Sequence, residues 1–296
     1  MTSEMPKGGK LSLDMMYKTA GIQINYDYTS EEDFEKKFKI GNYLAPLTIA
    51  LFANSPFNEN KLSGFLSYRG KVWQETNRGG IMPITFEKLN FEKYIDYAIN
   101  YPILFLKKNE KYYPPNGQTF YDFLKGNLSF LKGEKPTLKD FENHLGTIFT
   151  EIRLKKVIEF RSLDTCNFGC ICNGPSFFTG LIYGSLDETY EIIKSWKKEE
   201  VMEAYLNAPK QGLNTLLNNK TLFDWGKIFL DLSKKGLEKR NELNKSGKNE
   251  TIYLRHIEEI IENKRTRAEM LIEQFKKTKN LNFLVNHDEN FSYTGF

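Results

Sequence analysis

The nine-residue segment Lys156–Asp164 has the two-residue alternation of a β-strand. Ile158 and Phe160 point to one side of such a strand, and Glu159 and Arg161 point to the other. The apolar side can pack on a core, while a carboxylate can ligate a hard divalent cation and a guanidinium can bind phosphate with two parallel bonds. The segment therefore predicts a strand whose polar face is either a metal–phosphate site or, more commonly, a solvated Glu–Arg pair.

A second alternating segment lies near the start of the sequence, at residues 20–28. Its residues divide between two faces, with Ile22, Ile24, Tyr26 and Tyr28 on one and Gln23, Asn25 and Asp27 on the other. Thr29 and Ser30 precede three acidic residues and predict a helix start. If the two strands share a sheet, their polar faces line one cleft; the pattern leaves that pairing open.

Length and charge limit the class of protein. A chain of 296 residues suffices for one large domain or two modest ones. Lys and Arg number 42 and Asp and Glu 38, so we expect no nucleic-acid binder. We find no apolar run near the ~20 residues of a membrane span and no signal peptide, and we expect a cytoplasmic protein without membrane contact.

Three cysteines, Cys166, Cys170 and Cys172, fall within seven positions. A zinc site usually needs a fourth ligand, and the sequence offers only three histidines. We expect reduced, partly buried thiols, with a disulfide or a metal as the alternatives.

The remaining pattern predicts an α+β order. A helix over about 31–53, kinked at Pro46, is followed by a loop-rich stretch at 57–80 that carries Arg69, Trp73 and Arg78. A helix near 91–100 precedes a hairpin whose strands are 103–106 and 111–113.

Further helix starts are predicted at Thr119, Thr137 and Ser185, each with an acid three residues later. From Ser176 onward the pattern is almost wholly helical, with charged amphipathic helices at 225–240 and 252–277.

Several segments together resemble one family. They are Met5-Pro6-Lys7, Leu13-Asp14-Met15-Met16, Gln23-Ile24-Asn25, Ala50–Phe57, Gly64–Ser67, Arg69, Trp73, Tyr94–Ala98, Glu142–Leu145, Glu151–Lys155 and Glu159-Phe160-Arg161. In this order they are similar to the glutamate–cysteine ligases of plants and many proteobacteria.

The resemblance implies a fold like the catalytic domain of glutamine synthetase, a curved antiparallel sheet that holds ATP, a divalent metal and glutamate on its concave face. It implies one catalytic-type domain over 1–296, with the sheet in 1–165 and a mostly helical part in 166–296. The implied reaction is the first step of glutathione biosynthesis: ATP phosphorylates the γ-carboxylate of glutamate, and the amine of cysteine attacks the acyl phosphate. The implied cofactor is Mg²⁺, and such chemistry is largely positioning plus charge neutralisation.

The resemblance also implies roles for individual residues. Glu159 is expected to ligate metal, and Gln23 occupies the strand position where distant relatives place a metal-binding His. Arg161 and Asn25 are expected at the nucleotide, with Arg161 and Arg69 as catalytic groups. The expected substrate-binding residues are Arg69, Arg78, Trp73, Met15 and Met16. The structural alternatives are a core position for Trp73, an ion pair for Arg153 and a solvated strand end for Asp27.

The sequence departs from the family pattern in three places. The stretch Trp73–Gly80 is about two residues shorter than in relatives, and Thr165–Phe168 replaces a Gly-Gly-Pro-Trp run. The chain also begins where relatives are about a third of the way through, so the sheet is expected to lack its first strands. Three readings stay open: the ligase with a missing segment or a complementing chain, a carboxylate–amine ligase with another acceptor, and a non-catalytic partner subunit.

Overall fold

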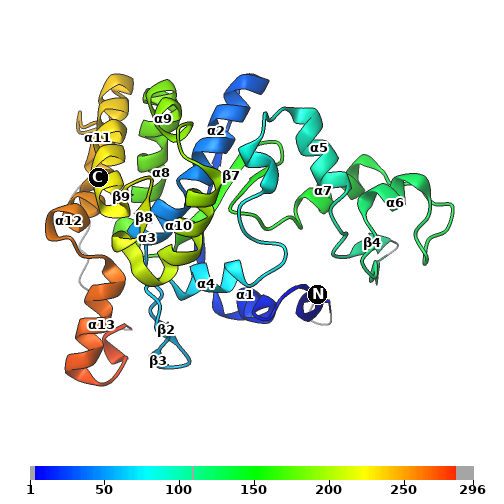
Figure 1. Ribbon diagram of the computed structural model, residues 1–296, viewed down its shortest axis with the longest axis horizontal. Helices are drawn as coiled ribbons and strands as arrows, with labels where there is room; N and C mark the ends of the chain where they lie inside the picture. The colour runs from blue at the N-terminus through cyan, green and yellow to red at the C-terminus, as the bar shows by residue number, and fades with distance from the viewer. Residues whose placement is uncertain (1–3, 109, 285–296) are drawn as a thin grey trace. The chain divides into compact units, whose positions relative to one another are not determined.

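The computed structural model describes residues 4–108 and 110–284, which form an α+β fold (Figure 1). These residues divide into two compact units that interleave along the chain. Unit 1 takes residues 4–18, 25–42 and 72–160, and unit 2 takes 19–24, 43–71 and 161–284. Unit 2 therefore includes early segments as well as the C-terminal part of the chain.

The central sheet has three strands, β1 (Gly21–Tyr26), β6 (Ile152–Leu154) and β7 (Ile158–Asp164), in the order β1-β7-β6. The expectation that the two alternating segments share a sheet is thus confirmed. Burial alternates along β1, with the three apolar side chains buried and Gln23 and Asn25 exposed. Every residue of β7 is buried, so its polar side chains must find partners inside the protein.

The expected helix over 31–53 is two helices, α2 (Glu31–Tyr43) and α3 (Ala45–Leu51). Ser30 Oγ accepts the Asp33 N–H at the start of α2, as predicted. Pro46 lies in the first turn of α3, where its missing N–H costs nothing. All seven residues of α3 are buried.

Two groups of apolar side chains show how unit 1 is packed. Phe34 and Phe38 of α2 pack on Phe91 and Tyr94 of α5 (Phe91–Ile99) through stacked and edge-to-face rings. The second cluster is centred on Phe120 and Phe123. The other elements assigned wholly to this unit are η1 (Met5–Gly8), α1 (Ser12–Lys18), η2 (Pro83–Phe86), β4 (Leu106–Lys108), β5 (Lys111–Tyr113), α6 (Phe120–Lys125) and α7 (Leu138–Leu145).

Several local expectations of this region hold and two need correction. Thr119 and Thr137 form capping boxes at α6 and α7. The hairpin partner of 111–113 is 106–108 rather than 103–106. The stretch 57–80 is not only loop: it contains the hairpin β2–β3 (Phe57–Asn58 and Lys61–Leu62) and helix α4 (Tyr68–Gln74), which carries Arg69 and Trp73.

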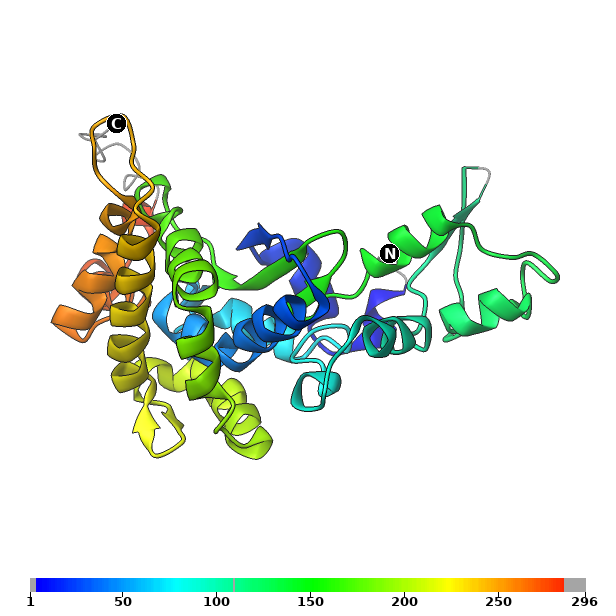
Figure 2. The ribbon, with the colours of Figure 1, turned by 90° about the horizontal axis from the view of Figure 1, so that it is seen from above.

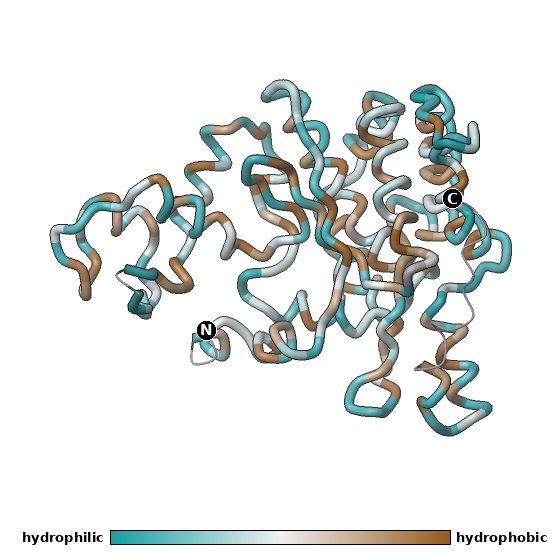
Figure 3. Tube along the Cα trace, turned by 180° about the vertical axis from the view of Figure 1, so that it is seen from behind, coloured by the Kyte–Doolittle hydropathy of each residue, from teal (hydrophilic) through white to brown (hydrophobic). Residues whose placement is uncertain are grey.

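Unit 2 is mostly helical beyond residue 168. In Figure 2, α11 (Leu222–Arg240) lies between α12 (Arg255–Asn263) and the segment formed by α8 (Asn173–Thr179) and η4 (Gly180–Gly184). The trace alternates between hydrophobic and hydrophilic colours along these helices, as in amphipathic helices (Figure 3). The remaining elements are η3 (Phe168–Cys170), α9 (Leu186–Ile193), α10 (Lys198–Gln211), η5 (Gly212–Asn214), β8 (Leu216–Leu217), β9 (Lys220–Thr221), η6 (Glu250–Leu254), α13 (Arg267–Thr278) and η7 (Asn282–Leu284).

One expectation in this unit is confirmed and another is wrong. Helix α9 begins directly after Ser185, as predicted, but without a side-chain cap, because the Ser185 hydroxyl donates to the carbonyl of Leu232. The helix expected over 252–277 is interrupted at Lys264, which has a left-handed backbone, and α13 begins after the Thr266 cap.

Glycines bring η4 and α11 into direct backbone contact. A Cβ added at Gly180 would overlap the carbonyl of Ser233, and one at Gly184 would overlap the backbone of Gly236. Hydrogen would be the only substituent that fits at these positions. Among the described residues, no helix is long and apolar enough to cross a membrane.

Candidate functional site

The carboxylate of Glu159 is held by two cations. Arg153 lies directly opposite it on β6, and its Nε and Nη2 donate to the two carboxylate oxygens at 2.9 and 3.1 Å. Lys155 Nζ lies 3.0 Å from Oε2. Arg153 also donates to the carbonyls of Gly146 and Ile148, which confirms its predicted structural ion pair.

A buried carboxylate stays ionised when cations and donors compensate the lost hydration. Arg153 and Lys155 already bind the Glu159 carboxylate, so a metal there would compete with these two cations for its oxygens. The described residues contain no group of three or more His, Cys, Asp or Glu side chains that could hold a metal ion. Gln23, the other expected ligand, is an exposed residue of β1, as is Asn25.

Arg69 and Arg161 both belong to unit 2, and the side chain of Arg69 contacts the backbone of Arg161. Arg69 Nη2 donates to the main-chain carbonyl of Arg161, and both residues are buried. A Cβ on Gly21 would lie 2.5 Å from Arg69 Nε and 2.8 Å from the Leu163 carbonyl. Gly21 therefore leaves the space that the guanidinium group occupies beside the strand.

Asp164, at the end of β7, accepts three hydrogen bonds in the same unit. Its Oδ2 accepts from the Asn54 N–H at 2.9 Å and from Ser55 Oγ at 2.7 Å, and its Oδ1 accepts from Ser67 Oγ at 2.8 Å. Burial raises the pKa of Asp164, while the nearby Arg69 charge and these donors act in the opposite direction.

The two serines connect Asp164 to the start of α4. Each hydroxyl has one hydrogen, which it donates to Asp164, so its lone pairs are available to accept. Ser55 Oγ accepts the Arg69 N–H, and Ser67 Oγ accepts the Gly70 N–H, both at 3.0 Å. Asp164 therefore fixes the first turn of the helix that carries Arg69.

The other expected substrate-binding residues lie in packed surroundings in unit 1. Arg78 donates to the Thr147 carbonyl, to Thr147 Oγ1 and to the Pro102 carbonyl at 2.8–3.1 Å, and its guanidinium lies over the Tyr101 ring. Burial lowers the pKa of Arg78. Trp73 is buried and meets Phe149 edge-to-face, in line with the core alternative.

Met15 is buried and Met16 half-buried in α1. Both lie in unit 1, as do Arg78, Trp73 and Glu159, whereas Arg69, Arg161 and Gln23 lie in unit 2. The expected site residues are thus divided between the two units.

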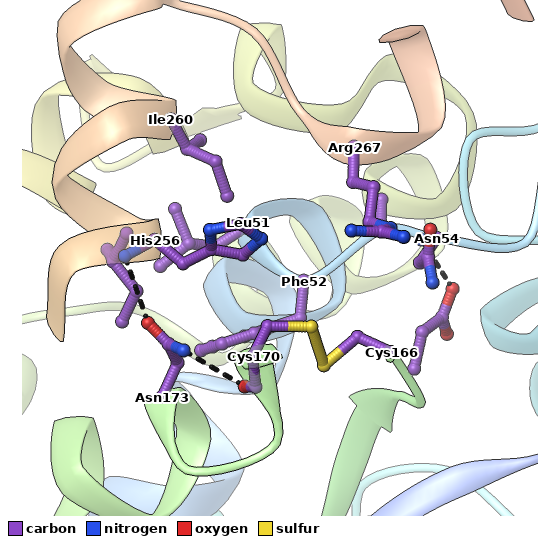
Figure 4. Close-up of a pocket in the computed structure, with 12 residues that line it drawn as sticks. Leu51, Phe52, Asn54, Cys166, Cys170, Asn173, His256, Ile260 and Arg267 are labelled. Atoms are coloured by element: carbon purple, nitrogen blue, oxygen red, sulfur yellow. Dashed lines mark hydrogen bonds between the residues drawn. A yellow bond between two sulfur atoms is a disulfide. The ribbon is translucent and has the colours of Figure 1, made fainter. Parts of the chain in front are cut away.

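A small cavity lies within unit 2, where α12 and α13 face the end of β7 (Figure 4). Its volume of about 20 Å³ accommodates roughly one water. A neighbouring open cavity of about 400 Å³ shares Asn54, Cys166 and Arg267 with it. The Nδ2 of Asn173 donates to the Cys170 carbonyl, and its Oδ1 accepts the His256 N–H.

The cysteine expectation needs correction at this cavity. Cys166 and Cys170 form a disulfide, which was the alternative to reduced thiols, and Cys172 is a half-buried free cysteine. A spacing of four residues suits a disulfide because the intervening turn η3 brings the two backbones to a Cα–Cα distance of 6.0 Å.

The model of glutamate-cysteine ligase family 2 matches residues 1–287 of the sequence. The chain belongs to this family. Among similar proteins, glutamate–cysteine ligase B of rice (Oryza sativa subsp. japonica), named as chloroplastic, is 40% identical over 281 residues, 93% of this chain and 55% of the relative. The chloroplastic glutamate–cysteine ligase of tomato (Solanum lycopersicum) is 40% identical over 276 residues, 92% of this chain and 52% of the relative.

The Arabidopsis thaliana chloroplastic glutamate–cysteine ligase is 39% identical over 280 residues, again with 93% of this chain and 52% of the relative covered. This member of family 2 therefore spans about half the length of the curated relatives it matches. These relatives are chloroplastic by name, so they lend no support to the cytoplasmic expectation, which stays a prediction.

Sequence reasoning missed several polar residues of this family member. Asp164 could have been noticed as a carboxylate on the same strand face as Ile158 and Phe160, where an apolar residue is the rule. No pattern pointed to Asn173, His256 or Arg267, because tertiary packing alone brings them to one cavity.

Proposed function

We propose that this chain supplies part of the site of an ATP-dependent glutamate–cysteine ligase, which joins the γ-carboxylate of glutamate to the amine of cysteine. The products are γ-glutamylcysteine, ADP and phosphate, formed through γ-glutamyl phosphate. The family membership supports the reaction class. The glutamine synthetase-like curved sheet remains part of this proposal, and the three-stranded sheet β1-β7-β6 would be one portion of it.

The observation that carries the proposal is the pair Arg69 and Arg161. A guanidinium held beside a strand by a backbone carbonyl and a glycine is rigid before a ligand arrives, which reduces the entropy lost on binding. Arginine also binds carboxylate or phosphate with two parallel bonds that lysine cannot reproduce. We assign Arg69 to a substrate carboxylate and Arg161 to phosphate.

The described residues do not fit a complete magnesium site. Glu159 is paired with Arg153 and Lys155, and no cluster of three acids, cysteines or histidines lies among residues 4–108 and 110–284. One carboxylate is a weak ligand set for Mg²⁺, which prefers an octahedral oxygen shell. These residues alone would therefore not position a magnesium ion for phosphoryl transfer.

The incomplete set of metal ligands favours a second candidate function, a subunit that catalyses the reaction only together with a partner polypeptide.

The test is an ATP- and Mg²⁺-dependent assay for γ-glutamylcysteine with the purified chain. The assay is run alone and with the part of the rice relative that this chain does not match, added as a separate polypeptide. We expect turnover only in the second arm. Robust turnover by the chain alone would contradict the partial-site proposal, and alternative amines in place of cysteine would reveal another acceptor.

A further inference from the structure

The carboxylate of Asp164 is buried at the end of β7, where three hydrogen bonds and the nearby Arg69 charge compensate for the lost hydration. Burying a carboxylate is costly unless strong hydrogen bonds compensate it. Its three donors are Asn54, Ser55 and Ser67. The hydrogen bonds that compensate for burying the Asp164 charge therefore all come from residues close to the start of α4, the helix that carries Arg69.

Each serine hydroxyl in this network both donates and accepts a hydrogen bond. Ser55 and Ser67 donate to Asp164, and their oxygens accept the N–H groups of Arg69 and Gly70. An amide at position 164 is uncharged and has one acceptor oxygen instead of two, so one of these hydroxyls would lose its acceptor and the first-turn N–H groups would be less well bonded.

The other end of Arg69 is held by β1 and β7. The guanidinium donates to the Arg161 carbonyl and lies against Gly21, so the side chain is fixed at its base by α4 and at its tip by the strands. The space beside Gly21 is narrow, so the guanidinium fits there only if the Arg69 backbone keeps its position at the start of α4.

We propose that Asp164 is the positioning residue for Arg69: through Ser55 and Ser67 it sets the first turn of α4 and thereby holds the guanidinium where it binds the substrate carboxylate. The carboxylate contact rests on the proposed function, whereas the positioning of Arg69 does not depend on it. Glutamate affinity in this family member is then controlled by a residue that does not touch glutamate.

The test measures the rate at which phenylglyoxal modifies Arg69, read by peptide mass spectrometry. Arg78, also buried but held by Thr147 and Pro102, serves as the reference within the same protein. In D164N, S55A and S67A we expect Arg69 to react about tenfold faster, the effect of losing one hydrogen bond to a charged group, with Arg78 unchanged. S55T and S67T, which keep the hydroxyl, should restore the slow rate.

D224N is the matched control, because Asp224 also accepts from a hydroxyl, that of Thr221, but at the start of α11. An unchanged Arg69 rate in D164N and in both alanine variants would overturn the proposal. So would equal rates in the threonine and alanine variants, or an effect of D224N as large as that of D164N. Should D164N fail to fold, the serine variants decide alone.

L-glutamate provides the second arm of the same experiment. We expect it to slow Arg69 modification in the wild-type chain and to protect less in S67A than in S67T. Absence of protection in the wild type would refute the carboxylate role of Arg69 under the proposed function, while the modification rates without glutamate would still decide the positioning role.

Discussion

The buried carboxylate of Glu159 depends on Arg153 for most of its compensation, since Lys155 is partly exposed. We expect Arg153→Leu to lower the free energy of unfolding by about 3 kcal/mol, because removing one partner of a buried pair leaves the other charge uncompensated. Urea unfolding checks this value. Lys139→Gln breaks the exposed pair with Glu142 and should have no measurable effect; equal losses in the two variants would contradict the buried-pair account.

His144 makes stability depend on pH. Its Nε2 bonds to the Ala98 carbonyl and its ring stacks on Phe120, and burial, with a smaller effect of the Arg78 charge, lowers its pKa to about 4. Because the folded-state pKa lies below the unfolded value, protonation favours the unfolded chain. Stability is full above pH 6.5 and falls as the pH drops towards 4, by up to about 3 kcal/mol.

The free energy of unfolding of wild type and His144→Phe, measured between pH 4 and 7, isolates this contribution. His256, whose pKa burial also lowers, is present in both proteins and cancels in the difference. The difference between the two proteins should change with pH over this range; a constant difference would show that His144 does not titrate as expected.

At the scale of elements, two glycines of α11 should respond oppositely to the same change. A Cβ at Gly236 overlaps the Gly180 backbone, which cannot move aside, so Gly236→Ala should destabilise the protein by about 3 kcal/mol. A Cβ at Gly226 meets only side-chain ends, Ile261 at 3.0 Å and Leu47 at 3.8 Å, and alanine is the better helix former there. Thermal unfolding of the two variants should therefore differ clearly, and similar melting temperatures would contradict the backbone contact.

Local signals predicted the elements whose ends are set by neighbouring residues. The alternation of β1 and the capping boxes of Thr119 and Thr137 were correct, because a strand face or a cap is a property of a few adjacent residues. The helix start at Ser185 was also correct, but its hydroxyl makes no cap, because it donates to the carbonyl of Leu232, far along the chain. Helix α4 was missed although Ser67, just before it, accepts the Gly70 N–H; the other bond at its start goes to Ser55, which is distant in sequence.

For the molecule as a whole, the resemblance selected the correct family, but the site residues were predicted one by one. Arg69 and Arg161 were named without the carbonyl that joins them, and Glu159 without its second cation, Lys155. Their roles in binding remain predictions. Hydrogen bonds between segments about 90 to 110 positions apart leave no periodic trace in a sequence, which is why the Asp164 network could not be foreseen.

The disulfide gives a prediction for the intact chain. With iodoacetamide under denaturing, non-reducing conditions we expect one labelled cysteine, Cys172, and three after reduction, since the sequence has three cysteines. Intact mass spectrometry counts the labels. Three labels without reductant would show that the thiols are reduced, as the sequence alone suggested.

The interleaving of the two units also matters while the chain is being synthesised. Helix α3, buried throughout, packs on α10 and α11, yet Lys198 at the start of α10 follows Leu51 by 147 positions. At about 5–20 residues per second a ribosome needs roughly 7–30 s to make that stretch. During this time the apolar surface of α3 lacks those two covering helices, so the nascent chain should be a client of ribosome-associated chaperones over this interval.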